Sequence, residues 1–66
     1  MTTFKDPQVT TYNSGNKEIT ALMNSGPLEF IVYIRVNKYG RAYDSSFKRG
    51  TRIFEEFEKV AQKLLA

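Results

Sequence analysis

Hydrophobic residues alternate with other residues over 28–36 (LEFIVYIRV) more regularly than anywhere else in the chain. A spacing of two is the repeat of a β-strand, in which successive side chains point to opposite faces. The segment 24–27 (NSGP) is rich in turn formers and interrupts any regular element before it. We therefore predict a strand from Leu28 to Val36 whose even-numbered side chains face a core.

A turn at 37–40 (NKYG) follows this strand, with Gly40 suited to the left-handed position of a three-residue hairpin loop. We expect 41–49 to return as an antiparallel strand, with Asn37 opposite Arg41. The pairs that follow are Val36–Ala42, Arg35–Tyr43, Ile34–Asp44, Tyr33–Ser45, Ile31–Phe47 and Glu29–Arg49.

This register divides the hairpin into two faces. The predicted core face carries Phe30, Val32, Ile34, Val36, Ala42 and Ser46. The opposite face carries Ile31, Tyr33, Arg35, Arg41, Tyr43 and Phe47. Asp44 and Lys48 fall on the core face, so they must lie at its margin, or the register is shifted by one residue and every side chain of the return strand is reversed.

The first half of the chain reads as a second hairpin. Residues 8–12 (QVTTY) and 18–23 (EITALM) flank the turn formers 13–16 (NSGN). A short helix over 17–23 is the alternative, because this segment is rich in helix-forming residues. Residues 1–7 are expected to form an N-terminal tail or edge segment, since Pro7 lacks the N–H that a central strand needs. Residues 8–66 are expected to form a single domain.

The C-terminal segment has the pattern of an amphipathic helix. Its apolar residues Ile53, Phe54, Phe57, Val60, Ala61, Leu64 and Leu65 follow helical spacing. Thr51 or Gly50 is the expected N-cap. Together the elements predict an α+β fold in which a four-stranded antiparallel meander carries one helix on one face. A helix at 17–23 would change the order to β-α-β-β-α.

Composition excludes much chemistry. The 66 residues include no Cys and no His, so a disulfide, a Cys/His zinc site and a Ser-His-Asp triad are all excluded. The carboxylates form neither a paired acid–base pattern nor an Asp-rich calcium loop. We therefore expect a protein that is not an enzyme and that uses neither a metal nor a cofactor.

The positive charge is concentrated in one segment. Residues 26–50 hold five cations and two acids, which accounts for the whole net charge of +3, together with five of the nine aromatic residues. Several proteins that bind single-stranded nucleic acids use a sheet face on which Arg and Tyr alternate, because rings stack on bases and cations contact phosphates. The candidate binding residues are Tyr33, Arg35, Lys38, Tyr39, Arg41, Tyr43, Lys48, Arg49 and Arg52.

Each candidate also has an ordinary structural explanation. Tyr and Phe pack well on any pleated surface. The cations at 48–52 lie at a helix N-terminus, where anions bind, but a capped turn with solvated charges has the same composition. Because one helix covers one sheet face, the other face needs a cover, which predicts a homodimer, a protein partner or a nucleic acid.

The main alternative function is a small protein-binding regulator or inhibitor, of the kind encoded by phages and mobile elements, acting on an acidic partner through the same hairpin. Tyr and Arg are common anchors of protein interfaces. The longest apolar run, 30–34, is too short to cross a bilayer, and the first residues lack the apolar core of a secretory signal. We expect a cytoplasmic protein with no membrane contact.

The expected order of four strands and a helix, over residues 8–65, resembles that of whirly and PUR-type single-strand nucleic-acid-binding modules. The resemblance rests on topology alone, with no shared sequence motif, so it assigns no role to any residue. It implies dimers that bind nucleic acid through curved sheets.

Overall fold

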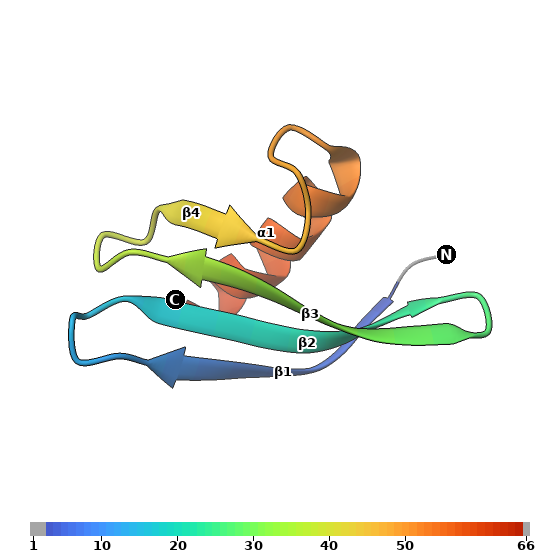
Figure 1. Ribbon diagram of the computed structural model, residues 1–66, viewed down its shortest axis with the longest axis horizontal. Helices are drawn as coiled ribbons and strands as arrows, with labels where there is room; N and C mark the ends of the chain where they lie inside the picture. Colours follow the sequence, from blue (N-terminus) through green and yellow to red (C-terminus); the bar gives the residue numbers. More distant parts are fainter. Residues whose placement is uncertain (1–2, 66) are drawn as a thin grey trace.

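The computed structural model describes residues 3–65, which form four strands and one helix. The elements are β1 (Thr3–Thr11), β2 (Lys17–Ser25), β3 (Leu28–Val36), β4 (Ala42–Ser45) and α1 (Arg52–Leu65). Neighbouring strands pair antiparallel in the order β1-β2-β3-β4, so the sheet is an open meander (Figure 1). The predicted α+β fold is confirmed, and β3 has the predicted bounds.

Residues 17–23 belong to a strand, so the helical alternative is wrong. Ile19 and Ala21 are buried against the helix, whereas the intervening Thr20 is half-buried on the other face. Burial of every second side chain stabilises the strand. This packing outweighs the helix propensity of the individual residues. The turn before β2 closes with Tyr12 N–H donating to the Asn16 carbonyl at 2.8 Å, and Gly15 adopts a φ of 91°.

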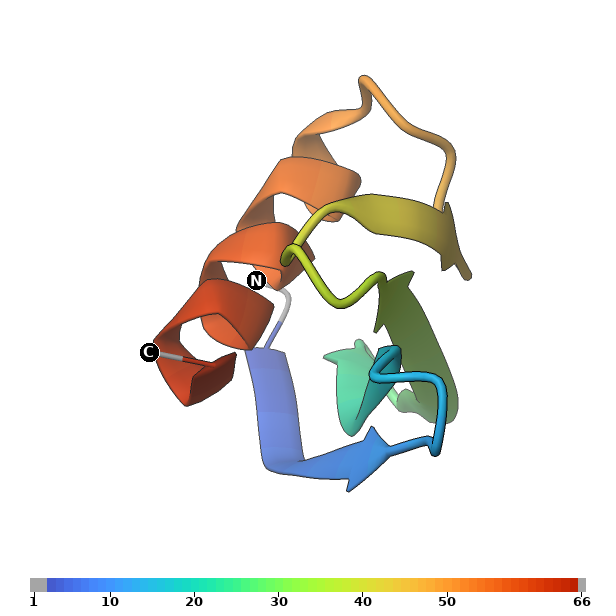
Figure 2. The same cartoon turned by 90° about the vertical axis from the view of Figure 1, so that its left-hand side faces the viewer.

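Strand β1 bends at a bulge in its middle. Lys5 pairs with Leu22 and Gln8 with Thr20, so two residues, Asp6 and Pro7, oppose one residue of β2. Asp6 has a φ of 49°, the left-handed region that Asp tolerates better than most residues. The bulge turns the first part of β1 toward the helix (Figure 2). Of residues 1–7, expected as a tail or edge segment, 3–7 are the bent start of the edge strand, and 1–2 lie outside the described residues.

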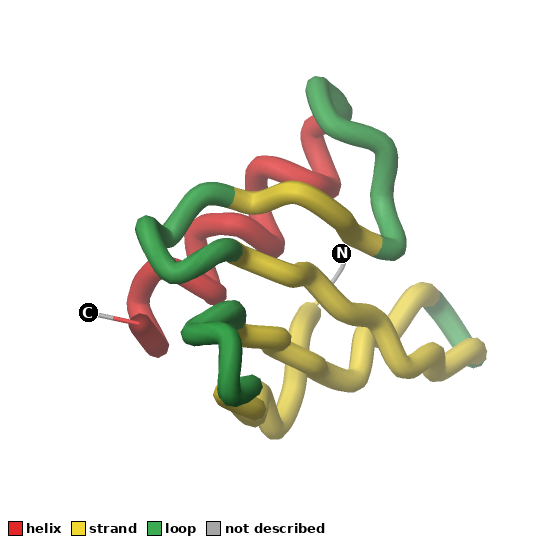
Figure 3. Tube along the Cα trace, turned by 60° about the vertical axis from the view of Figure 1, so that its left-hand side comes forward, coloured by secondary structure: helices red, strands yellow, loops and turns green. Residues whose placement is uncertain are grey.

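Helix α1 lies across one side of the sheet (Figures 2 and 3). It begins directly after Thr51, whose Oγ1 accepts a hydrogen bond from Phe54 N–H at 3.3 Å. Thr51 is therefore the N-cap, one of the two residues expected for this role. Within residues 3–65 the structure contains no helix with the length and apolar character needed to span a membrane.

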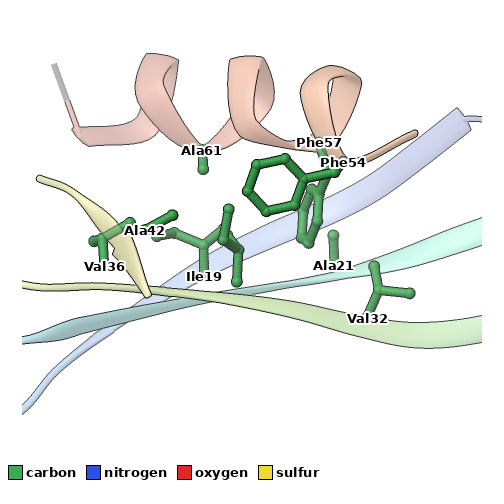
Figure 4. Packing of buried hydrophobic residues seen from close by; sticks show 9 residues of the cluster. Ile19, Ala21, Val32, Val36, Ala42, Phe54, Phe57 and Ala61 are labelled. Atoms are coloured by element: carbon green, nitrogen blue, oxygen red, sulfur yellow. The ribbon is translucent and has the colours of Figure 1, made fainter. Parts of the chain in front are cut away.

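The core lies between α1 and the helix-facing side of the sheet. Figure 4 shows Phe54, Phe57 and Ala61 of the helix above side chains of the sheet. The buried set is Ile19, Ala21, Val32, Ile34, Val36, Ala42, Phe54, Phe57 and Ala61. Two of the sheet residues in this set, Ala21 and Ala42, are small, which leaves room for the two aromatic rings. Phe4, from the bent start of β1, stacks on Phe57 with ring centroids 4.9 Å apart.

The predicted register between β3 and β4 is correct at Val36–Ala42 and wrong beyond it. A bulge lies between Arg35 and Val36, so Arg35 pairs with Asp44 rather than with Tyr43. The extra residue in β4 is Tyr43. The strand ends at Ser45 instead of continuing to Arg49.

The bulge reverses the side chains that follow it. Asp44, predicted on the core face, pairs with Arg35 on the other face, and Lys48 is exposed. Phe47, predicted on the outside, packs against the core with its ring edge-on to Phe57 at 5.9 Å. Ser46, predicted in the core, is exposed and donates its N–H to the Tyr33 carbonyl. The shift keeps a carboxylate out of the core and places a ring there instead.

Candidate nucleic-acid interface

The sheet face turned away from α1 is called the outer face below. Strand pairing places Glu18, Thr20, Leu22, Ile31, Tyr33, Arg35 and Asp44 on it. These positions alternate with the buried positions of β2 and β3, as the strand period requires. The predicted site residues Tyr33 and Arg35 therefore do lie together on an accessible surface.

Arg35 is held by two carboxylates. Its Nε–H donates to Glu18 Oε2 at 2.7 Å, and its Nη1 lies 3.2 Å from Asp44 Oδ2. The Tyr33 ring lies 4.9 Å from the guanidinium carbon. The hydrogen bond that Arg35 donates to Glu18 raises the pKa of Arg35 above its ordinary value. The two carboxylates outnumber the single guanidinium, so this group of three side chains carries a formal charge of −1.

Tyr12, the residue directly after β1, joins this network. Its hydroxyl donates to Glu18 Oε1 at 3.3 Å. Partial burial raises the pKa of the Tyr12 phenol, and the nearby Glu18 carboxylate raises it further. Sequence analysis did not single out Tyr12 or Glu18. The signal that could have found them is the pairing of β2 with β3, which puts Glu18 directly opposite Arg35.

Two more tyrosines complete the aromatic part of the surface. Tyr33 donates from its hydroxyl to Asp44 Oδ2 at 3.4 Å, which fixes the ring over the sheet. Tyr43, the residue added by the bulge, is 54% exposed. Tyrosines at these positions present faces that a base or another planar group can stack on.

The β3–β4 turn forms a separate basic tip. Asn37 N–H donates to the Arg41 carbonyl at 2.9 Å, which closes the turn. Tyr39 is 81% exposed, and Lys38 Nζ lies 5.3 Å from the centre of its ring. Within the described residues neither Lys38 nor Arg41 forms an ion pair.

The two hairpin turns at this end of the molecule lie beside each other. A Cβ added to Gly15 would come within 3.1 Å of Lys38 Cβ, so the two turns are in close contact. Figure 3 shows the corresponding loops next to one another. The arrangement brings Tyr12 of one hairpin to the same end as Lys38 and Arg41 of the other.

The remaining predicted cations are placed differently. Lys48 is exposed in the loop before α1, and Arg52 lies 3.7 Å from Glu56 on the helix surface. The Arg49 guanidinium donates to the Ala42 carbonyl and lies 6.0 Å from the Phe54 ring. Arg49 thus covers the free edge of β4, and its guanidinium is used in contacts with other residues of the same chain.

A groove of about 490 Å³ runs between β4 and the first turns of α1. Arg41 and Arg49 line it from one side, and Glu55 and Glu58 line it from the helix. Two cations and two anions balance, so the groove is no basic channel.

The predicted residues therefore fall into three groups. Tyr33 and Arg35 lie on the outer face, with Tyr43 at the bulge of β4 and Tyr12 bonded to Glu18 beside them. Lys38, Tyr39 and Arg41 form the basic tip, and Tyr39 and Arg41 also line the groove beside α1. Lys48, Arg49 and Arg52 lie apart from them in the segment that leads into α1.

No known protein family, curated protein or solved structure matches this chain. The topological resemblance noted above is therefore unsupported by any matching structure. The support for the candidate interface comes from its geometry alone.

Proposed function

We propose that the protein binds nucleic acid, single strands in particular, along the outer face and the β3–β4 turn. The observation that carries the proposal is the group of exposed aromatic rings, Tyr12, Tyr39 and Tyr43, beside two cations that form no ion pair among the described residues. Rings that stack on bases and cations that contact phosphates are the two components of such binding.

The proposed roles follow from exposure and charge. Tyr39 and Tyr43 offer ring faces to bases, and Lys38 and Arg41 contact phosphates. Arg35 has a different role, because Glu18 and Asp44 already neutralise it: it holds the Tyr33 ring in position. Among residues 3–65 no helix lies on this surface, so base stacking on a single strand is favoured over reading of a duplex groove.

Fluorescence anisotropy of a labelled mixed-sequence single strand would test the proposal. The titration is made at about 50 and at about 200 mM salt, because release of counterions makes phosphate binding strongly salt-dependent. We expect binding at low salt that weakens steeply at higher salt. Absence of binding at low salt would overturn the proposal.

Two pairs of variants locate the interface. Tyr43→Ala is expected to lose about 1–3 kcal/mol of binding free energy if a base stacks on the ring, whereas Tyr43→Phe retains most of it. Lys38→Gln is expected to weaken binding and to reduce the salt dependence. Lys59→Gln, which removes the same charge from the helix, is the matched control and is expected to change little.

A second candidate function, binding of an acidic protein partner by a small regulator or inhibitor, is favoured by one observation. Glu18 and Asp44 hold Arg35 beside the tyrosines, so this part of the surface combines acidic, basic and aromatic groups, and such mixed surfaces with Tyr and Arg anchors are typical of protein interfaces. The same titrations separate the two: salt-tolerant binding to an acidic protein, with no affinity for oligonucleotides, supports this alternative.

A further inference from the structure

Strand β3 has an open edge along its first half. Strand β4 pairs only with 34–36, and Ser46 adds hydrogen bonds at Tyr33, so 28–32 have no neighbour on that side among the described residues. Figure 1 shows this half of β3 extending with the end of β2 beyond β4. The segment is also apolar: Leu28 is 57% exposed, Phe30 44% and Ile31 78%.

The free backbone groups of this edge can be identified from Tyr33. Its N–H donates to Ser46 Oγ at 2.9 Å and its carbonyl accepts from Ser46 N–H at 2.9 Å, so the backbone of Tyr33 is directed toward the β4 side. By the alternation of a strand, Ile31 and Glu29 direct their N–H and C=O to the same side. Pro27 is the next residue in this alternation, and as a proline it has no N–H to donate.

The other two sheet edges are protected and this one is not. The edge of β1 is interrupted by a bulge and by Pro7. The edge of β4 is four residues long, and Arg49 covers its Ala42 carbonyl. Natural sheets protect their edges by such devices, because an unprotected apolar edge pairs with another strand. Residues 28–32 contain no proline, no bulge and no cation.

We propose that this edge pairs antiparallel with the same edge of a second copy of the chain, about a two-fold axis at Phe30. Glu29 of each copy then exchanges both backbone hydrogen bonds with Ile31 of the other. This register uses every free N–H and C=O of Glu29 and Ile31 and leaves Tyr33 with Ser46. An axis at Ile31 would instead set Glu29 against Tyr33, whose groups are already bonded.

The side chains fit the same register. Phe30 lies directly opposite Phe30 of the second copy, in the closely spaced kind of pair, and Leu28 lies opposite Val32. Glu29 faces Ile31 instead of another Glu29, so no like charges oppose each other. The self-complementarity of this short edge argues for a second copy as its occupant, and the argument is independent of any nucleic-acid binding.

Single-cysteine variants would test the register, because the natural chain has no cysteine. Phe30→Cys places two thiols across the axis at a separation that a disulfide can bridge, so mild oxidation is expected to give a covalent dimer. Leu28→Cys, which is more exposed but faces Val32, is the matched control and is expected to cross-link far more slowly. Equal rates for the two variants would overturn the register.

Sedimentation of the natural chain over a range of concentrations would test the association itself. We expect a monomer–dimer equilibrium that Ile31→Pro shifts to monomer, because proline removes an N–H used only between copies. The circular dichroism spectrum of that variant would stay unchanged, which would show that the core beneath α1 is intact. Tyr33→Asp, on the outer face, is expected to remain dimeric. A natural chain that stays monomeric at millimolar concentration would overturn the proposal.

Discussion

Phe4 and Phe57 stack with their ring centroids 4.9 Å apart and their planes inclined by 15°. They come from opposite ends of the chain, and Phe57 is fully buried. The contact depends on the bulge at Asp6 and Pro7, which turns the start of β1 toward α1. The first strand and the last helix thus close one core in a chain that has no disulfide.

We expect Phe4→Ala to lower the free energy of unfolding by about 2 kcal/mol, less than the value for a fully buried Phe because Phe4 is only half-buried. In a domain of this size the loss corresponds to a fall in melting temperature of about 10 °C. Thermal unfolding followed by circular dichroism would measure it. Tyr39→Ala, at the exposed turn, is the control and is expected to cost less than about 0.5 kcal/mol. Equal melting temperatures would contradict the stacked contact.

Thr51→Ala is expected to destabilise the protein by about 1 kcal/mol, because it removes the oxygen that accepts the Phe54 N–H at the start of α1. Thr51→Ser keeps that oxygen and serves as the matched control. Urea unfolding of the three proteins would give the values. A loss of similar size in both variants would indicate that the methyl group of Thr51, and not its hydroxyl, stabilises the helix start.

The period of the hydrophobic pattern was sufficient to predict β3 and α1. Val32, Ile34 and Val36 alternate strictly, and the only consistent structure buries all three on one face. The apolar stripe of the C-terminal segment defined α1 in the same way. Both patterns are local, so they can be recognised without knowing what packs against them.

The bulges could not be predicted in the same way, because they depend on partners distant in sequence. The conflict over Asp44 was visible as a carboxylate on the predicted core face. Its resolution, an extra residue opposite Arg35, requires knowledge of where the chain must leave the sheet to place Phe47 against Phe57. One inserted residue reverses every side chain after it.

The candidate site was predictable only in part for the same reason. Tyr33 and Arg35 follow from the alternation of β3. The carboxylates that neutralise Arg35 come from β2 and β4, and Glu18 lies on a segment for which a helix was the alternative. Net charge along the sequence therefore overstated the positive charge of the outer face.

Alkaline pH is expected to destabilise the protein through Tyr12. Partial burial and Glu18 raise the pKa of its phenol above the ordinary value of 10.0, so the folded chain holds this proton more tightly than the unfolded chain. The resulting stability is fully present at neutral pH and is lost as the pH rises above 10 through the folded pKa. Tyr12→Phe would remove this part of the pH dependence.

The phenolate absorbance of the natural protein, minus that of Tyr12→Phe, would report the titration of Tyr12 directly. In Glu18→Gln the pKa of Tyr12 is expected to fall toward its ordinary value, because a carboxylate that opposes ionisation is gone. An unchanged titration in Glu18→Gln would show that Glu18 has no influence on Tyr12.

The neutralisation of Arg35 leads to an unusual expectation for nucleic-acid binding. Asp44→Asn removes one of the two carboxylates that hold the guanidinium, at 3.2 Å, while keeping the shape of the side chain. Arg35 stays paired with Glu18, but the cluster loses its excess negative charge, so if the outer face binds a strand, the Nη1 group that Asp44 held can contact a phosphate. The affinity for a single strand would then rise, and the dependence of log K on log salt would steepen by about 0.7.

Glu56→Gln makes the same change in net charge on the helix, where Glu56 pairs with Arg52 at 3.7 Å. It separates a local effect at Arg35 from a general gain in positive charge. We expect anisotropy titrations to show tighter binding for Asp44→Asn than for Glu56→Gln, because only the first variant removes a negative charge beside the tyrosines. If both variants bind equally well, the strand responds to net charge alone, and the outer face is not where it binds.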